Sequence, residues 1–144
     1  MKTIAFIFAR GGSKRLKNKN LRIINGKPLI YYSIKIAKEI KKIEDIYVSS
    51  DNKKILDYAL SLGAKIIKRP KYLSTSKADE IMAWKHAVNF VLKKGIAFDY
   101  FLSLPTTSPL RIKRDIYRVF KSLKINTDIV LTATDTHRNP WKNM

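Results

Sequence analysis

Short apolar runs alternate along the chain with longer segments in which apolar residues recur every third or fourth position. A short apolar run predicts a buried strand, and a recurrence near 3.6 residues predicts an amphipathic helix. The strands are expected at residues 3–9, 45–50, 64–68, 100–104 and 127–132. The helices are expected at residues 28–40, 53–62, 77–94 and 112–124.

Turn-forming residues mark several boundaries between these elements. Asn25-Gly26 predicts a turn, and Pro28 is expected at the first position of a helix, where its missing N–H costs nothing. Asp51 is expected to cap the helix over residues 53–62, which Gly63 ends. The expected buried stripes are Ile30, Ile34, Ala37 and Ile40 in the first helix and Ile81, Trp84, Val88, Val91 and Leu92 in the third.

The alternation of strands and helices predicts an α/β fold. Successive β-α-β units build a mostly parallel sheet with helices on both faces, a Rossmann-like arrangement of three layers. Ligands of such sheets bind beyond the carboxyl ends of the strands. The informative loops are therefore at residues 10–20, 49–51 and 105–111.

Length and composition narrow the class of protein. The chain has 144 residues, 45% of them hydrophobic, which fits one domain over residues 1–144. No apolar run approaches the roughly 20 residues of a membrane span, and the apolar start lacks a signal-peptide cleavage site. The chain has no cysteine, which excludes disulfides, thiolate metal sites and cysteine nucleophiles. A cytoplasmic protein is the default expectation.

The charge of the chain is open to two interpretations. Lys and Arg number 30 against 11 Asp and Glu, a formal net charge of +19, which invites a nucleic-acid-binding module. Most of the cations are lysines spread along the chain, often near the ends of expected helices, where they stay solvated and complement the helix dipole. A solvated surface is therefore favoured over a nucleic-acid footprint.

The loop over residues 10–20 carries the clearest chemistry. It places five cations around Gly11-Gly12, where the backbone can approach a ligand closely, and Ser13 adds a hydroxyl. These groups suit a triphosphate, although neither the P-loop nor the dinucleotide-binding pattern is present. The alternative is a solvated basic turn.

The loop over residues 105–111 forms a second candidate site. Three hydroxyl residues and Arg111 lie in and beside a segment bounded by two prolines, and an arginine can grip a carboxylate or phosphate bidentately. The alternative is that Ser108 caps the next helix with Pro109 as its first residue. The segment Ser49-Ser50-Asp51 is equally open to both interpretations, a site loop or a helix cap.

Several of these segments together resemble the acylneuraminate (sialic-acid-type nonulosonic acid) cytidylyltransferases, the CMP-sugar synthetases. The matching segments, in family-like order and spacing, are residues 7–14, 19–21, 26–30, 48–51, 69–73, 105–111 and 137–140. The resemblance covers the whole chain and implies a nucleotide-diphospho-sugar transferase fold. It also implies transfer of CMP from CTP to a nine-carbon 2-keto sugar acid of sialic, legionaminic or pseudaminic type, with release of pyrophosphate, in the synthesis of cell-surface polysaccharide.

The resemblance assigns roles to individual residues. The catalytic residues it implies are Arg10, Lys14 and Lys19. The nucleotide-binding residues it implies are Ala9, Arg10, Gly11, Gly12, Ser13, Lys14, Lys19, Asn20 and Arg69. The sugar-binding residues it implies are Pro105, Thr106, Thr107, Ser108 and Arg111. The partners it implies are CTP, a nonulosonic acid and a second copy in a homodimer, without nucleic acid or membrane.

The sequence also departs from the family pattern. The family is longer, and its further part supplies a dimerisation segment and an Asp-x-Asp pair that holds Mg²⁺, a pair absent from these residues. Mg²⁺ is therefore expected as cofactor with no metal ligand in this chain, the chain is expected to be C-terminally incomplete, and weak CTP binding without turnover is expected of it. Pro105 replaces a glutamine common in the family, and Ser76 replaces an acidic residue.

Two other functions stay open at this point. One is a different nucleotidyltransferase of the same fold, making CMP-Kdo or transferring GMP. The residues of loop 105–111 argue against it, because the Kdo enzymes carry an acidic motif there. The other is a non-catalytic, basic nucleic-acid-binding module, which the charge favours and the ordered motifs oppose.

Overall fold

The computed structural model describes residues 1–13, 16–76 and 78–133. The chain divides into two compact units, Met1–Arg111 and Ile112–Met144, and each is described by itself. The first unit holds the sheet and the loops at its edge. The second contains α4 (Lys113–Ser122), where the expected helix over residues 112–124 is confirmed. Among the described residues, no helix is both long and apolar enough to span a membrane.

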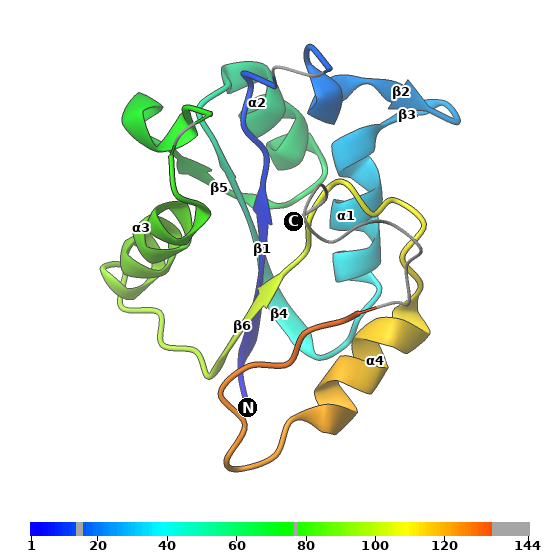
Figure 1. The fold of residues 1–144 in the computed structure, drawn as a ribbon, viewed down its shortest axis with the longest axis vertical. Helices are drawn as coiled ribbons and strands as arrows, with labels where there is room; N and C mark the ends of the chain where they lie inside the picture. The colour runs from blue at the N-terminus through cyan, green and yellow to red at the C-terminus, as the bar shows by residue number, and fades with distance from the viewer. Residues whose placement is uncertain (14–15, 77, 134–144) are drawn as a thin grey trace, which may run out of the picture. The chain divides into compact units, whose positions relative to one another are not determined.

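A parallel four-stranded sheet forms the centre of the first unit (Figure 1). Its strands are β1 (Thr3–Phe8), β4 (Ile43–Ser50), β5 (Lys65–Lys68) and β6 (Tyr100–Ser103). They lie in the order β5-β4-β1-β6, with β1 paired in parallel to both β4 and β6. Four of the five expected strands are thereby confirmed, with bounds that differ by one or two residues.

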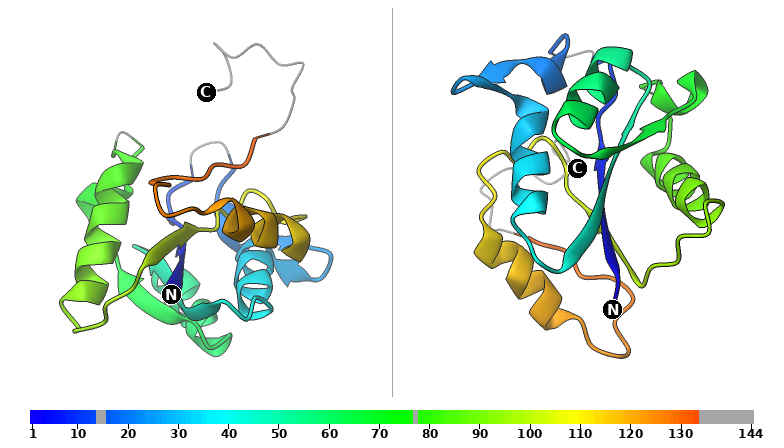
Figure 2. Two further views of the ribbon diagram at one scale, coloured as in Figure 1. Left: turned by 90° about the horizontal axis from the view of Figure 1, so that it is seen from below. Right: turned by 180° about the vertical axis from the view of Figure 1, so that it is seen from behind.

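Helices cover both faces of this sheet, as expected. On one face α1 (Leu29–Lys38) contacts β1 and β4, while α2 (Lys53–Ser61) contacts β4 and β5. On the other face lies α3 (Glu80–Leu92), which Figure 2 shows across the strands from α1. The short elements between them are η1 (Lys19–Leu21), the hairpin of β2 (Ile23–Ile24) and β3 (Lys27–Pro28), and η2 (Lys71–Ser74).

The core between α3 and the sheet consists of aromatic residues from the strands and small residues from the helix. Phe6 of β1 stacks on Phe101 of β6 with ring centroids 4.7 Å apart. The helix turns Ala83, Ala87 and Val91 inward, and small residues let it approach the aromatic strands closely. The expected stripe was wrong at its ends, because the first and last of its residues, Ile81 and Leu92, are exposed.

The start of α1 differs from the expectation in one detail. The expected stripe of Ile30, Ile34, Ala37 and Ile40 is buried. Pro28, however, precedes the helix and pairs with Ile23 in the hairpin. The turn at Asn25-Gly26 closes that hairpin with positive φ values of 46° and 76°, the conformation that Asn and Gly tolerate.

Residues 127–132 do not form the expected fifth strand. Thr127 closes a turn instead: its N–H donates to the Lys124 carbonyl, and its hydroxyl accepts from the Lys124 N–H, each at 3.0 Å. Ile129 and Leu131 are 74% and 84% exposed. A strand exists only through hydrogen bonds to a neighbouring strand, and this segment makes none with the described residues.

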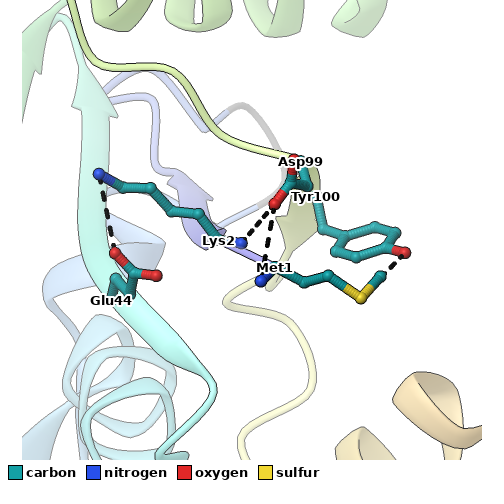
Figure 3. Close-up of polar contacts among 5 residues, drawn as sticks. All are labelled: Met1, Lys2, Glu44, Asp99 and Tyr100. Atoms are coloured by element: carbon teal, nitrogen blue, oxygen red, sulfur yellow. Dashed lines mark hydrogen bonds and ion pairs between the residues drawn. The ribbon is translucent and has the colours of Figure 1, made fainter.

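Polar contacts at the amino ends of the strands tie the chain terminus to the sheet (Figure 3). The Lys2 N–H donates to Asp99 Oδ2 at 2.6 Å, and the N-terminal amino group of Met1 lies 3.9 Å from the same oxygen. The Lys2 ammonium lies 3.7 Å from Glu44 at the start of β4. These exposed contacts lie at the opposite end of the strands from the loops that the sequence singled out.

Candidate functional site

A cleft of about 360 Å³ lies beyond the carboxyl ends of β1 and β6. The chain passes from β1 to β4 on one side and later reaches β6 on the other, so the direction of strand succession changes between β1 and β6. Crevices for ligands form at such switch points. The lining residues are Phe8, Arg10, Ser13, Lys19, Asn20, Arg69, Leu73, Thr75, Ala78, Asp79, Glu80, Ala83, Ser103, Pro105, Thr106 and Thr107.

The peptide between Arg10 and Gly11 is held on both sides. The Asn20 side-chain amide donates from Nδ2 to the Arg10 carbonyl at 3.0 Å. The Gly11 N–H donates to Asp51 Oδ1 at 2.8 Å. Both polar groups of one peptide unit are therefore bound by side chains from other parts of the fold, which fixes the plane of that peptide.

The two glycines of this loop serve different purposes. A Cβ on Gly11 would lie 2.8 Å from Asn52 Nδ2 and 2.9 Å from Asn52 Cβ, so a larger residue does not fit. A Cβ on Gly12 would meet no atom of the other described residues within 4 Å, its two chain neighbours apart. Gly11 thus permits close packing on the β4–α2 connection, while Gly12 leaves the backbone open on its outer side. The Ser13 N–H folds back onto the Gly11 carbonyl at 3.1 Å.

Asn52, and not Asp51, caps α2, which corrects the expectation. The Asn52 side chain accepts from the Ile55 N–H at 3.3 Å, and Asn52 directly precedes the first helical residue. An N-cap occupies that position because its side chain must reach back to the N–H groups of the first turn. Asp51 lies one residue too early for this, and its carboxylate turns to Gly11 instead.

The loop after β6 is anchored by buried hydroxyl groups. The Thr106 hydroxyl donates to Asn20 Oδ1 at 2.7 Å, and both residues are almost fully buried. The Ser33 hydroxyl of α1 donates to the Pro105 carbonyl at 3.2 Å. Because Asn20 also binds the Arg10 carbonyl, its side chain joins the loop after β1 to the loop after β6 across the cleft.

Arg111 lies at the end of this loop, apart from the residues that line the cleft. Its Nη2 donates to the Pro105 carbonyl at 3.4 Å, and its buried Nη1 has no hydrogen-bond partner among the described atoms. Burial lowers the pKa of its guanidinium. The helix-cap interpretation of Ser108 is wrong, because α4 begins after Ile112 without a side-chain cap.

Arg69 is a buried cation in the wall of the cleft. Its Nε donates to the Ser49 hydroxyl at 3.1 Å and its Nη2 to the Ser49 carbonyl at 2.7 Å. The guanidinium also lies 5.5 Å from the centre of the Phe8 ring. Burial lowers the pKa of Arg69, whereas the negative charges of Asp51 and Glu80 oppose that shift. The arginine therefore joins the carboxyl ends of β4 and β5 and presents a fixed positive charge.

The third wall of the cleft comes from the connection between β5 and α3. The resemblance pointed to Arg69 at its start, but the list of loops at strand ends left this connection out, and its lining residues Thr75, Asp79 and Glu80 were not assigned to the site. Arg10 reaches it through a hydrogen bond from Nη1 to the Thr75 carbonyl at 3.0 Å. Asp79 caps α3 by accepting from the Ile81 N–H at 2.9 Å. This segment follows the carboxyl end of a strand, as the other two loops do, and the same rule would have pointed to it.

The expected site residues fall into three groups. Those along the cleft are Arg10, Ser13, Lys19, Asn20, Arg69, Pro105, Thr106 and Thr107. Those beside it, outside the lining, are Ala9, Gly11, Gly12, Ser108 and Arg111. Lys14 lies outside the described residues, as does the segment over residues 137–140. Among the residues that the structure describes, the cleft thus gathers three cations, Arg10, Lys19 and Arg69, with two acidic residues, Asp79 and Glu80, in the α3 wall.

The sequence of this chain is similar to those of several curated bacterial proteins. Two relatives are 36% identical: the post-translational flagellin modification protein B of Campylobacter coli, over 96% of this chain and 60% of that protein, and the CMP-N,N'-diacetyllegionaminic acid synthase of Legionella pneumophila, over 97% and 61%. A pseudaminic acid cytidylyltransferase of Campylobacter jejuni is 34% identical over 97% of this chain and 61% of that enzyme. The chain therefore spans about 60% of the length of these curated relatives.

Solved structures show the same fold. A CMP:2-keto-3-deoxy-manno-octonic acid synthetase complexed with CTP superposes with a TM-score of 0.69 and 23% identity, over 84% of this chain and 46% of that one. A 4-diphosphocytidyl-2C-methyl-D-erythritol synthase superposes with a TM-score of 0.67 and 14% identity, over 95% and 65%. The expected α/β nucleotidyltransferase fold is confirmed.

The family itself is shown by a match along nearly the whole sequence. The model of the cytidylyltransferase family matches residues 4–139, which include the three loops around the cleft. The chain therefore belongs to the cytidylyltransferase family.

Proposed function

We propose that this chain is the nucleotide-binding part of an enzyme that transfers CMP from CTP to a nonulosonic acid and releases pyrophosphate. The observation that carries the proposal is the cleft at the β1–β6 switch point. It is lined by Arg69 and by Arg10 and Lys19 of the glycine loop, the loop over residues 10–20 that contains Gly11 and Gly12. Relatives named for pseudaminic and legionaminic acid support the sugar class.

The cations suit the chemistry of nucleotidyl transfer. A sugar hydroxyl attacks the α-phosphorus in line and loses its proton to solvent. The bond from that phosphorus to the oxygen bridging the α- and β-phosphates breaks, and pyrophosphate leaves with the electron pair. Negative charge grows on the leaving group, so fixed cations stabilise the transition state more than the bound substrate. We assign that role to Arg10 and Lys19, with Lys14 assigned to it by the family alone.

The remaining loops position the two substrates. Arg69 and Asn20 support the wall that receives the nucleoside, because both are buried, Arg69 being bonded to the end of β4 and Asn20 to the loop after β6. Pro105, Thr106 and Thr107 line the side assigned to the sugar acid. Holding the sugar hydroxyl in line with the α-phosphorus supplies the rest of the rate enhancement. The reaction then needs no covalent intermediate with the enzyme.

Mg²⁺ stays an expectation drawn from the family. The described ranges contain no group of three or more His, Cys, Asp or Glu able to hold a metal ion. Asp51 and Asp79 each have one oxygen bound by a backbone N–H. These residues do not form a magnesium site by themselves, so no step above is assigned to the ion. A homodimer and a cytoplasmic location belong to the same proposal.

Calorimetric titration with CTP, ATP and GTP, with and without Mg²⁺, tests the proposal. Lys19→Ala removes a cation of the cleft, and Lys17→Ala removes an exposed cation two positions away that does not line it. We expect CTP to bind best and Lys19→Ala to weaken it roughly tenfold or more, as for a charged hydrogen bond of about 1.5–3 kcal/mol.

Two results would count against this function. Equal binding of the three nucleotides that vanishes with added salt would favour the basic nucleic-acid-binding module, whose affinity depends steeply on salt. Preference for GTP would favour a nucleotidyltransferase of the same fold with another donor. Lys17→Ala should bind CTP as the wild type does.

A further inference from the structure

We propose that Asp51 is a positioning residue for the glycine loop, and this inference rests on the proposed function. Its carboxylate accepts the Gly11 N–H and so fixes the peptide that carries Arg10 toward the cleft. Asp51 itself is not among the residues that line the cleft. Its effect on a bound triphosphate is therefore exerted through the loop.

The first step of the argument is the double anchoring of one peptide unit. Its carbonyl, from Arg10, is held by Asn20, and its N–H, from Gly11, is held by Asp51. The two anchors come from different elements, η1 and the segment after β4. Rotation of this peptide would break both hydrogen bonds, and the bond to Asp51 is of the stronger kind because its acceptor is charged.

The second step is that helix capping does not explain Asp51. Asn52 caps α2, and its own N–H is held by the Ser50 hydroxyl at 3.1 Å. The Asp51 carboxylate therefore does not cap the helix and instead binds the glycine loop. An acidic group beside a loop that receives phosphates is electrostatically unfavourable. For Asp51 this unfavourable effect is offset, because its carboxylate accepts the Gly11 N–H and lies near the positive charge of Arg69.

The third step concerns which backbone groups the loop offers to a ligand. The Gly11 N–H is already bonded to Asp51, so it is not a phosphate donor in this arrangement. The open backbone is at Gly12, where no atom of the described residues, Gly12 and its two chain neighbours apart, lies within 4 Å of the Cβ position. Asp51 therefore selects the orientation in which Gly11 packs on Asn52 and Gly12 faces outward.

The test compares Asp51→Ala with Asp51→Asn. Alanine removes the acceptor, whereas the asparagine side-chain carbonyl can still accept the Gly11 N–H. Asp57→Ala is the matched control, because Asp57 is an exposed carboxylate on α2 whose contact among the described residues is an ion pair with Lys53, one helical turn away. Affinities for CTP and CMP are measured by calorimetry, and the midpoint of urea unfolding shows that each variant is folded.

We expect Asp51→Ala to weaken CTP binding tenfold or more and CMP binding by less than threefold, since the loop is assigned to the outer phosphates. Asp51→Asn should stay within threefold of the wild type for both. Equal CTP affinity of Asp51→Ala and wild type would overturn the proposal. Equal damage by alanine and asparagine would also overturn it, because the negative charge, as in a metal ligand, would then be what matters.

A second measurement separates this inference from the proposed function. Amide hydrogen exchange at Gly11 reports the hydrogen bond without any nucleotide. We expect protection in the wild type and in Asp51→Asn, and fast exchange in Asp51→Ala. If the wild type binds no CTP, the proposed function fails, and the exchange data still show whether Asp51 holds the loop. Fast exchange in the wild type would overturn the anchoring itself.

Discussion

The hydroxyl of Thr106 and the side-chain carbonyl of Asn20, 86 residues apart in the sequence, share a buried hydrogen bond of 2.7 Å. This bond joins the loop after β6 to the loop after β1. Asn20 is oriented by it, because its Nδ2 must then face the Arg10 carbonyl, which only accepts. The two walls of the cleft therefore hold each other through one side-chain amide.

Thr106→Val should break this connection with little change of shape. The Asn20 oxygen would stay buried without a donor, which costs about 1–3 kcal/mol. We expect the free energy of unfolding in urea to fall by that amount and CTP affinity to fall with it. Thr106→Ser keeps the hydroxyl and serves as the control. Equal stability of the valine variant and the wild type would show that the bond is not formed in solution.

Gly11→Ala should damage the site by collision with Asn52. The added Cβ would lie 2.9 Å from the Asn52 Cβ, closer than two carbons approach without a shift of the backbone. We expect loss of CTP affinity and a fall in unfolding free energy of about 1–3 kcal/mol, as for an overpacked site.

Asn52→Gly should partly restore the Gly11→Ala protein. It removes the colliding side chain, and glycine at a helix N-cap costs only a few tenths of a kcal/mol. Thermal or urea unfolding of the four proteins forms a double-mutant cycle. A coupling free energy near zero would contradict the close packing of Gly11 on Asn52. Gly12→Ala, at an open position, should leave stability within about 0.5 kcal/mol of the wild type.

Replacing Arg69 should separate binding from stability. Arg69→Met removes two hydrogen bonds to Ser49, but it also removes a charge whose burial is costly, so the net loss of stability should stay below about 3 kcal/mol. The loss of a cation from the cleft should weaken CTP binding roughly tenfold or more. The control is Lys68→Met at the adjacent exposed position. An equal loss of affinity in both variants would indicate a general effect of charge.

Much of the fold could be predicted from sequence because each element carries a local signal. The strands of the sheet are short apolar runs, and the buried stripe that begins in α1 at Ile30 continues regularly to Ile40, just beyond the helix. Residues 127–132 carry the same kind of signal and form no strand. Pairing is not encoded locally, so a run of apolar residues states only that a strand could form there.

The site was predicted at the level of loops more than of single residues. The rule that ligands bind beyond the carboxyl ends of strands located the loops after β1 and β6. It did not show that Asp51 turns to Gly11 or that Asn20 spans two loops, because such contacts join residues 40 and 86 positions apart. The α3 face was misjudged at Ile81 and Leu92, since small residues made the closer contact to an aromatic sheet.

The contacts at the amino ends of the strands should affect stability alone. Asp99→Ala removes the acceptor for the Lys2 N–H and the nearby charge for the N-terminal amino group (Figure 3). Both contacts are exposed, so we expect a loss of about 1 kcal/mol or less in urea unfolding. CTP affinity should not change, because the cleft lies at the other end of β1. A change in affinity would mean that the two ends of the sheet are coupled.

His86 should make the stability of the fold depend on pH. Burial lowers the pKa of His86 below its ordinary value of 6.5, and the positive charge of Arg69 lowers it further. The folded protein therefore binds this proton more weakly than the unfolded chain does. Above about pH 6.5 His86 is mostly neutral in both states, and its titration costs the fold no stability. As the pH falls from there through the lower pKa of the folded state, the unfolded chain takes up the proton more readily, and the fold loses stability.

The variant His86→Gln isolates this effect. Glutamine does not titrate, so its unfolding free energy should fall less than that of the wild type between pH 7 and pH 5, as urea unfolding at each pH would show. The acidic groups titrate in both proteins, so the difference between the two curves belongs to His86. Because Arg69 contributes to the shift, Arg69→Met should reduce that difference. Parallel curves for wild type and His86→Gln would mean that His86 is as accessible to protons in the folded protein as in the unfolded chain.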